Sequence, residues 1–243
     1  MIELEICANS VASAGAAQQG GADRVELCDN MAEGGTTPSY GTLRKAREQL
    51  SLQLYPIIRP RGGDFLYTKE EFDIMLSDIK VCKELGCDGI VIGLLNTDGN
   101  IDVERTKRLV DAAGPMGVAF HRAFDRCNDP FQALEDIIIC GCRRLLSSGQ
   151  QPTAVAGADL LGKLVRQAGD RLTVMPGSGV RPDNIAHLIR TTGATAYHST
   201  AKSTASSRMQ YKNALAHMED NNLSVTNAEV VRALRQASAQ NRA

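Results

Sequence analysis

The chain has 243 residues, 43% of them hydrophobic, which is enough to bury the core of one large α/β domain. With 27 Lys and Arg against 28 Asp and Glu its formal net charge is −1, and this balance argues against nucleic acid or an anionic membrane surface as a partner. The sequence shows no signal-peptide pattern and no apolar run near the roughly 20 residues that span a bilayer, and 7 scattered cysteines favour reduced thiols in a cytoplasmic protein.

One pattern recurs along the chain: a glycine, a few small or polar residues, and then a short apolar strand. Its copies are Gly21–Leu27, Gly86–Ile92, Gly141–Leu146 and Gly193–His198. Further strand-like runs lie between the copies, at Leu4–Cys7, Leu54–Arg59, Val118–His121 and Leu172–Met175. Each repeated glycine follows a helical stretch, so we expect it to end a helix in the left-handed conformation.

The helix starts are also readable. Thr68 and Glu71 form a capping-box pattern, and Asp129 precedes a proline at the first helical position. Strands that alternate with helices in this way predict a single-domain (βα)8 barrel over residues 1–243. An open, doubly wound sheet is the competing fold, but the turn after the first strand lacks the glycine fingerprint that such a sheet carries there.

The connections after the strands are uneven. The loops at 29–39 and 60–67 are long and contain glycine pairs. After the last strand, the segment from about 199 to 222 shows no periodicity, and a final helix is predicted over 226–240. All three connections lie at the carboxyl ends of the strands, where barrels build their active sites.

The first two strands end in the same Glu-x-Cys motif, at Glu5 and Cys7 and again at Glu26 and Cys28. Side chains alternate along a strand, so all four are expected to point into the mouth of the barrel. Neighbouring strands lie about 4.8 Å apart, which would let the two thiols share a soft ion such as Cu(I). The alternative interpretation is that the cysteines are small apolar residues that only fill the barrel.

The third strand leads into Arg59 and Arg61, followed by a glycine pair. Two guanidinium groups at a strand end predict a clamp for a carboxylate or another anion. They could equally serve to neutralise Glu5 and Glu26, because charges inside one barrel mouth must be paired.

His121 ends the fifth strand, with Asp125 shortly after it, and is the favoured candidate for proton transfer or metal ligation. A hydrogen-bonded structural histidine is the alternative. His198, at the end of the eighth strand, is a second candidate, whereas Lys202 is placed too late to act as a Schiff-base lysine.

Small residues follow strands six and seven. Ser148 ends the sixth strand, and Gly177 and Gly179 expose backbone N–H groups after the seventh. Barrels hold phosphate in this position, which predicts an anion site, although glycines also merely permit a tight turn.

Several motifs together resemble the CutC family, which is named for copper homeostasis. They are LEIC (4–7), RVELC (24–28), EGGTTPS (33–39), RPRGGDF (59–65), HRAFD (121–125) and SSGQ (147–150), and the resemblance runs from about residue 3 to 215. It implies a cytoplasmic (βα)8 barrel that forms a homo-oligomer, a dimer or tetramer, and a role in copper tolerance or Cu(I) binding with Cys7 and Cys28 as the metal ligands. It implies no reaction.

Two functions therefore stay open. In the first, the chain handles copper, Cys7 and Cys28 bind Cu(I), and no organic cofactor is needed. In the second, it is a lyase, isomerase or hydrolase for a small anionic or phosphorylated metabolite. The groups that would hold the anion are Arg59, Arg61, Ser148, Gly177 and Gly179, with Glu5 or Glu26 as base and His121 or Asp125 as acid.

Overall fold

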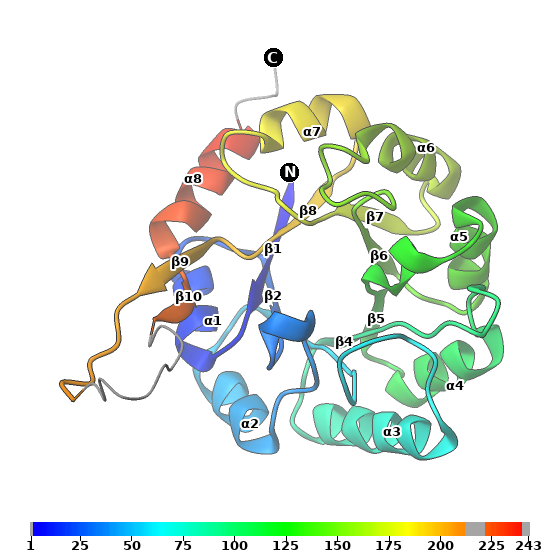
Figure 1. Ribbon diagram of the computed structural model, residues 1–243, viewed down its shortest axis with the longest axis horizontal. Helices are drawn as coiled ribbons and strands as arrows, with labels where there is room; N and C mark the ends of the chain where they lie inside the picture. The colour runs from blue at the N-terminus through cyan, green and yellow to red at the C-terminus, as the bar shows by residue number, and fades with distance from the viewer. Residues whose placement is uncertain (1, 212–221, 240–243) are drawn as a thin grey trace.

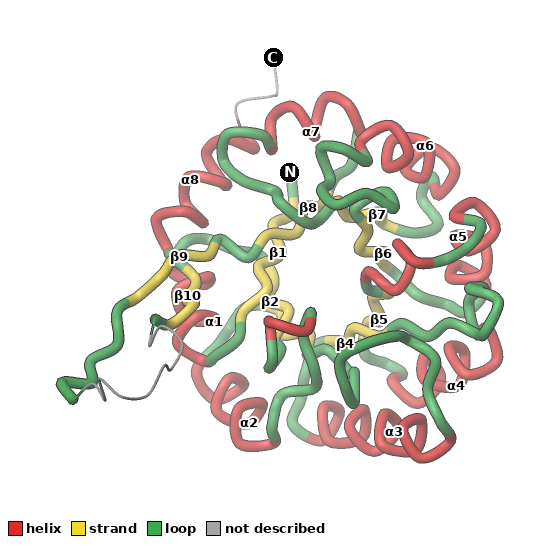
Figure 2. Tube along the Cα trace, in the orientation of Figure 1, coloured by secondary structure: helices red, strands yellow, loops and turns green. Residues whose placement is uncertain are grey.

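The computed structural model describes residues 2–211 and 222–239. Eight strands form an inner ring, and helices surround it (Figures 1 and 2). The ring strands are β1 (Glu3–Ala8), β2 (Arg24–Leu27), β3 (Gln53–Pro56), β4 (Gly89–Ile92), β5 (Gly117–Phe120), β6 (Arg144–Ser147), β7 (Thr173–Pro176) and β8 (Ala196–Ser199). The helices are α1 (Val11–Gln19), α2 (Tyr40–Gln49), α3 (Lys69–Glu84), α4 (Val103–Ala113), α5 (Pro130–Ile139), α6 (Ala158–Ala168), α7 (Ile185–Thr192) and α8 (Ala228–Ala239).

The strands pair in parallel and close into a barrel. The hydrogen-bonded orders are β3-β2-β1-β8 and β4-β5-β6-β7. An isolated parallel bridge between Ile57 and Val91 connects β3 to β4, and β7 lies beside β8. The predicted barrel is confirmed, and the open doubly wound sheet is wrong because the first strand pairs with the last.

The local signals at the helix ends form as predicted. Thr68 and Glu71 make both hydrogen bonds of a capping box at the start of α3, and the Asp129 side chain caps α5 ahead of its proline. The repeated glycines adopt the left-handed conformation, with φ of +74° at Gly86 and +90° at Gly141. These caps set where each helix stops and the next strand enters the ring.

The region after β8 differs from the prediction of an aperiodic segment. Within it, β9 (Lys202–Ala205) pairs antiparallel with β10 (Leu223–Thr226), and the hairpin packs beside α1 (Figure 1). Residues 212–221 of the predicted segment lie outside the described part of the chain. The final helix, α8, begins at Ala228 rather than 226 because the Asn227 side chain caps its first turn.

The apolar side chains divide between two faces of the ring. The outward face, with residues such as Leu4, Ile6 and Leu27, packs under the helices. The inward face carries two small apolar clusters of its own, which contain Ile57, Val91 and Ala119 in one and Leu146, Met175 and Ala196 in the other. Among the described helices, none is both long and apolar enough to cross a membrane.

Two short 3-10 helices, η1 (Met31–Glu33) and η2 (Arg122–Arg126), follow β2 and β5 at the carboxyl ends of the strands. Both lie over the mouth of the barrel (Figure 2). They bring loop side chains above the strand ends, and thereby help to build the site described next.

Candidate functional site

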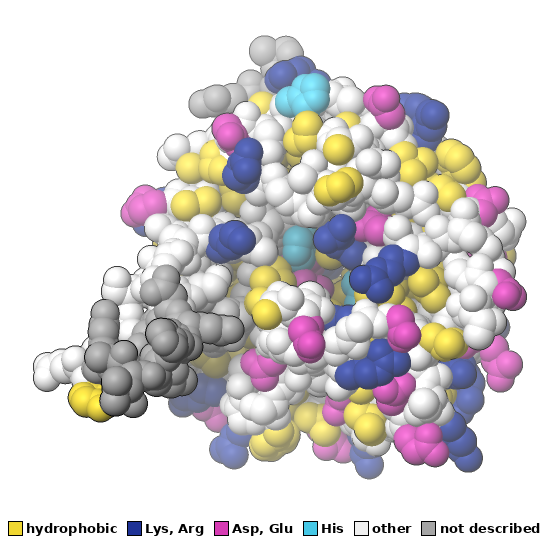
Figure 3. All heavy atoms as spheres, viewed as in Figure 1, with side chains coloured by type: hydrophobic (Ala, Val, Ile, Leu, Met, Phe, Trp, Pro, Cys, Tyr) yellow, Lys and Arg dark blue, Asp and Glu magenta, His cyan; other side chains and the backbone are white. Residues whose placement is uncertain are grey.

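A cavity of about 730 Å³ opens at the carboxyl ends of the strands. In the space-filling view a histidine is visible in the hollow, with lysine and arginine side chains around its rim (Figure 3). Its lining includes Cys7, Glu26, Met31, Arg59, His121, Arg122, Gly179, Arg181, His198 and Lys202. The size suits a small molecule, since ligand pockets typically have volumes of about 300–1,000 Å³.

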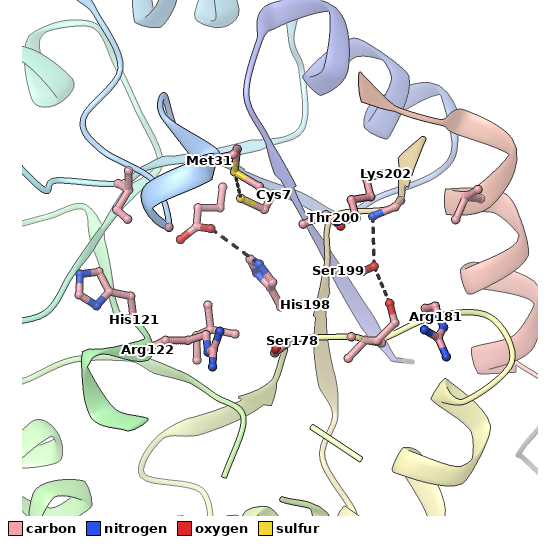
Figure 4. Close-up of a pocket in the computed structure, with 18 of the residues that line it drawn as sticks. Cys7, Met31, His121, Arg122, Ser178, Arg181, His198, Ser199, Thr200 and Lys202 are labelled. Atoms are coloured by element: carbon pink, nitrogen blue, oxygen red, sulfur yellow. Dashed lines mark hydrogen bonds and ion pairs between the residues drawn. The ribbon is translucent and has the colours of Figure 1, made fainter. Parts of the chain in front are cut away.

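Three sulfur atoms meet at one end of this cavity. Cys7 Sγ lies 3.5 Å from Cys28 Sγ. The Met31 thioether lies 3.6 Å from Sγ of Cys7 (Figure 4) and 3.0 Å from Sγ of Cys28. Both cysteines are buried, and all 7 cysteines are free. The thiol contact with Cys28, burial and the nearby Glu26 carboxylate raise the pKa of Cys7 well above its usual range.

A chain of buried charges lies next to the sulfurs. Glu5 pairs with Arg24 on β2 and accepts a hydrogen bond of 2.6 Å from Nδ1 of His198 on β8. Nε2 of that histidine lies 3.7 Å from Glu26. Residues 5 and 198 are opposite each other in the β1–β8 register, so this contact exists only because the barrel closes.

The charges in this chain shift one another's pKa values. Burial raises the pKa of Glu5, but Arg24 and the His198 hydrogen bond outweigh it and lower the value to about 2. Burial lowers the pKa of His198, yet the two carboxylates raise it above its ordinary value. Burial raises the pKa of Glu26, against the opposing effect of His198. Glu26 is therefore the carboxyl group that faces the cavity and holds a proton more readily, whereas Glu5 is a fixed anion below it.

His121 lies in the opposite wall of the cavity (Figure 4). Its Nδ1 accepts a hydrogen bond from the backbone N–H of Ala123, so the neutral ring carries its proton on Nε2. Burial, and then the positive charge of Arg59, lower its pKa to about 3. Nε2 has no partner among the described residues. Gly93 makes room for the ring, because a Cβ there would lie 2.2 Å from the imidazole.

Arg59 is buried and lines the cavity, but protein groups already satisfy most of its donors. Its guanidinium donates to the backbone oxygens of Glu33 (2.7 Å), Gly35 (2.8 Å) and Gly63 (3.1 Å), and it stacks over Phe65 at 4.9 Å. Arg59 thus links the loop after β2 to the loop after β3. It supplies positive charge to the cavity, but its two Nη groups are already bonded to protein oxygens and do not form a bidentate site for a ligand.

A comparison with known protein families is decisive. The model of the CutC family matches residues 2–203 of the chain. The chain belongs to the CutC family. It is 56% identical over 239 residues to a CutC family protein of Chromobacterium violaceum, covering 96% of this chain and 97% of the relative. A CutC family protein of Xylella fastidiosa is 46% identical over 231 residues, covering 95% of this chain and 86% of the relative.

Solved structures agree with this CutC assignment. The crystal structure of a CutC protein from Streptococcus agalactiae is 34% identical and superposes with a TM-score of 0.79, covering 82% of this chain and 99% of that one. A phosphoribosyl anthranilate isomerase from Thermotoga maritima superposes with a TM-score of 0.59 at 11% identity, covering 99% and 100%. The latter likeness shows only that the barrel fold is shared.

Several residues predicted for the mouth of this CutC chain lie elsewhere. Arg61 pairs with Asp64 (2.9 Å) and Glu71 (2.6 Å) beside α3, and does not line the cavity. The prediction extended strand alternation from Arg59, but β3 ends at Pro56 and the chain turns after it. The expected pair of arginines in the mouth is therefore wrong.

Asp125 and Ser148 bind each other instead of the cavity. The Asp125 carboxylate accepts hydrogen bonds from Ser147 Oγ (2.6 Å), Ser148 N (3.0 Å) and Gln150 N (3.2 Å), and pairs with Arg122 (2.8 Å). These contacts join η2 to the loop after β6, and neither residue is part of the cavity lining. Asp125 consequently has no free oxygen to act as an acid there.

The glycines after β7 have different positions. Gly179 lines the cavity, as predicted. Gly177 does not: a Cβ there would lie 2.4 Å from Leu146 and 3.2 Å from His198, so this glycine makes room for neighbouring side chains.

Sequence reasoning missed other lining residues. Met31 begins the short helix η1 and Arg181 lies on a loop, and neither stretch has a periodic signal. Lys202, expected to lie too far along the chain, reaches the cavity because β9 begins immediately after the ring. For Met31, the signal available was a thioether three residues beyond Cys28. Nothing in the sequence indicated that β8 would place Lys202 beside the mouth.

A second donor set shares Cys7 with the sulfur cluster. Ligand atoms of Cys7, Glu26 and His198 lie within 4.8 Å of one another, and all three side chains are buried. The carboxylate of Glu5 orients His198 from behind, an arrangement that histidine ligands of metals commonly show. The site thus offers two geometries, one made of sulfur alone and one of sulfur, oxygen and nitrogen.

Proposed function

We propose that this protein binds Cu(I) through the sulfur atoms of Cys7, Cys28 and Met31. The observation that carries the proposal is the meeting of these three sulfurs within 3.0–3.6 Å at the mouth of the barrel. Thiolate and thioether ligands select soft ions, and Cu(I) is the soft ion for which two thiols and a thioether are well suited. The Streptococcus agalactiae relative is named as a candidate copper homeostasis protein, which supports the same assignment.

Binding of an ion would require a wider spacing of the two thiols. Thiolate–metal bonds are about 2.3 Å long, so ligands on opposite sides of an ion lie up to roughly 4.6 Å apart. Cys7 and Cys28, now 3.5 Å apart, must separate by up to an ångström. Met31 is half-buried on η1 and unbranched, so it can move aside and return as a third ligand.

Loading also releases protons. The raised pKa of Cys7, caused by its contact with Cys28, burial and Glu26, keeps this thiol protonated at neutral pH before a metal binds. Cu(I) must displace that proton, so the apparent affinity should rise with pH. A reducing compartment is required for the thiols, and we therefore place this function in the cytoplasm.

The test is an anaerobic titration of the reduced protein with Cu(I) against a competing chelator. Cys28→Ser and Met31→Leu remove ligands of the sulfur set only, whereas Glu26→Gln removes a ligand only of the set with Glu26 and His198. Losing a group behind a ligand costs about 10–100-fold in metal affinity, so we expect Cys28→Ser to cost at least about 100-fold. Met31→Leu should cost less, and Glu26→Gln should change little.

Cys140→Ser is the matched control, since Cys140 is buried beside the Val103 backbone, away from the cavity. A Cu(I) affinity that is equal in Cys28→Ser and Cys140→Ser would refute the proposal. Loss in Glu26→Gln with retention in Cys28→Ser would instead assign the metal to Cys7, Glu26 and His198. That set, with imidazole and carboxylate ligands, suits Zn²⁺ rather than Cu(I).

A second candidate function rests on a separate observation, the size and charge of the cavity. About 730 Å³ lined by Arg59, Arg122, Arg181 and Lys202 is far more room and positive charge than one metal ion needs. This favours an enzyme of the lyase, isomerase or hydrolase type acting on a small anionic metabolite. Glu26, rather than Glu5, then exchanges the proton, because only Glu26 reaches the cavity and its pKa is raised by burial.

Neutral His121, with its proton on Nε2, would polarise an oxygen of that substrate. The measurement is the melting temperature of the protein against a panel of small phosphates, carboxylates and uncharged polyols. Selective stabilisation by anions supports an enzyme of this class. A melting temperature that no member of the panel raises would exclude it.

A further inference from the structure

The loop after β7 is anchored by its carbonyl groups. The backbone oxygen of Ser178 accepts from Ala154 N at 2.9 Å, that of Gly179 from Asn184 Nδ2 at 2.9 Å, and that of Val180 from Ser199 Oγ at 2.8 Å. All three residues line the cavity. Three successive carbonyls therefore have partners within the protein.

The orientation of the amides follows from this anchoring. In a trans peptide the N–H points away from the carbonyl of the preceding residue. The N–H of Gly179 is thus directed opposite to the anchored Ser178 oxygen, and the N–H of Val180 opposite to the Gly179 oxygen. Among the described residues neither N–H has a backbone or side-chain acceptor. Ser178 and Gly179 have φ of +76° and +75°, so the chain turns tightly here, and turns of this kind can present backbone N–H groups to an anion.

Positive charge surrounds the same end of the cavity. Lys202 lies in the first turn of chain after β8, and within residues 2–211 and 222–239 it forms no ion pair. Arg181 follows the loop, with one pairing to Asp183 at 3.2 Å. Ser178 and Arg181 lie across the cavity from the sulfurs of Cys7 and Met31, with His198 between them (Figure 4).

A buried donor in the cavity wall also lacks a partner. Nε2 of His121 is buried and unbonded in the described structure, although its ring lines the cavity. Leaving a buried polar group unpaired is costly, and this cost is recovered when a ligand oxygen accepts the bond. The anchored loop and His121 are thus complementary to two parts of one molecule.

We propose that the Gly179 and Val180 amides, with Lys202, bind the phosphate group of a small phosphomonoester whose remaining part extends toward His121 and Glu26. The proposal deepens the second candidate function and rests on it for the assignment of a substrate. It does not involve the sulfur cluster. Two amides without acceptors among the described residues, together with a lysine, match the three terminal oxygens and double charge of a phosphomonoester, whereas a carboxylate would leave part of the set unpaired.

The test is calorimetric titration of the full chain with inorganic phosphate and with glycerol 3-phosphate, using acetate and glycerol as the arms that lack phosphate. We expect both phosphates to bind, the ester more tightly because it also contacts the cavity, and acetate and glycerol to bind at least about tenfold more weakly. Lys202→Gln should weaken phosphate binding by about tenfold, the effect of losing one charge-assisted hydrogen bond.

Lys80→Gln is the matched control, because Lys80 is 77% exposed on α3 and lies outside the cavity lining. Gly179→Ala tests the amides: φ of +75° is strained for alanine, so its N–H should leave the cavity while the unfolding temperature reports whether the fold persists. Phosphate binding unchanged in Lys202→Gln and in a folded Gly179→Ala would overturn the assignment.

Two further outcomes separate this inference from the proposed functions. The Cys7→Ser/Cys28→Ser double variant should bind phosphate as the wild type does, whatever its Cu(I) affinity, and a loss of phosphate binding in it would count against the location proposed. Binding of acetate with no binding of phosphate would overturn the inference while leaving an anionic substrate in place.

Discussion

The two halves of the barrel interior differ sharply in chemistry. The half formed by β1, β2 and β8 holds a buried cluster of four ionisable side chains, Glu5, Arg24, Glu26 and His198. The half formed by β4 to β7 is lined mainly by aliphatic side chains and glycines, with Leu146 and Met175 among its apolar members. It also carries Arg144, which pairs with Glu3 on β1, and His121 at the end of β5. Most of the buried charge therefore lies in the first half, and most of the apolar wall lies in the second.

Two glycines in and just after β4 make room for large side chains of the neighbouring strands. At Gly89 a Cβ would lie 2.1 Å from the Tyr55 ring, and at Gly93 it would meet His121. Large side chains from one strand thus occupy space that the neighbouring strand leaves free. The polar half is stabilised by ion pairs and hydrogen bonds between buried side chains, and the other half is stabilised by apolar packing. The free energy of unfolding should therefore respond differently to substitutions in the two halves.

The largest effect is expected from Arg24→Met. Arg24 is fully buried, pairs with Glu5 and lies over Tyr55 at 4.3 Å. Its removal leaves a buried carboxylate without its main counter-charge, which typically costs about 3–5 kcal/mol of unfolding free energy. Urea unfolding at neutral pH measures this cost. The Arg24→Met/Glu5→Gln double variant should recover part of it, and a cost for Arg24→Met below about 1 kcal/mol would contradict the contrast drawn above.

The next largest effect is expected on the stability of the protein at low pH, through His121. Burial and Arg59 lower its folded-state pKa to about 3 from the ordinary 6.5, so the folded state favours the neutral ring. As pH falls, His121 is protonated in the unfolded chain before it is protonated in the folded protein. The stability that the neutral ring contributes above pH 6.5 is therefore lost between pH 6.5 and 3. At about 1.4 kcal/mol per pH unit, wild type should lose roughly 2–3 kcal/mol more than His121→Gln between pH 7 and 4.5.

Urea unfolding of both proteins across that pH range provides the measurement. Parallel curves for wild type and His121→Gln would show that the histidine titrates normally in the folded protein. A titration of its ring protons by NMR supplies an independent check, since the folded-state midpoint should lie near pH 3.

The smallest effect is expected in the aliphatic half. Leu146→Ala removes a buried side chain, a change that costs about 2–5 kcal/mol in closed cores. Because Leu146 borders the cavity, water can fill the space, and we expect a cost of about 2 kcal/mol by urea unfolding. A cost that exceeds that of Arg24→Met would reverse the order of the two halves.

The barrel itself could be predicted from the sequence because its signals are local. The repeated glycine before every second strand fixes helix ends, and Gly86 and Gly141 adopt the conformation that this role requires. Capping at Thr68 and Asp129 was equally readable. The β9–β10 hairpin was not, since its two short strands have no alternation strong enough to separate them from coil.

The site could be predicted only for residues whose direction, into the barrel or out of it, follows from the alternation of side chains along one strand. Cys7, Cys28 and Glu26 follow from it, and they lie together as expected. The pairing of His198 with Glu5 depends on which strands meet when the ring closes, which no local pattern encodes. The prediction that Arg61 points into the mouth was wrong because side chains alternate between the two faces only within a strand, and β3 ends at Pro56.

The pairing of the first ring strand with the last has a consequence for the chain during its synthesis. β1 pairs with β8, and Arg235 on α8 donates to the backbone oxygens of Ile2 and Gly21. During synthesis the first strand leaves the ribosome long before its second neighbour exists, so Glu5 and the thiol of Cys7 stay in water until β8 follows. A nascent chain therefore carries Cys7, Cys28 and Met31 before the wall formed by β8 can enclose them, and these sulfurs are open to metals and oxidants in solution.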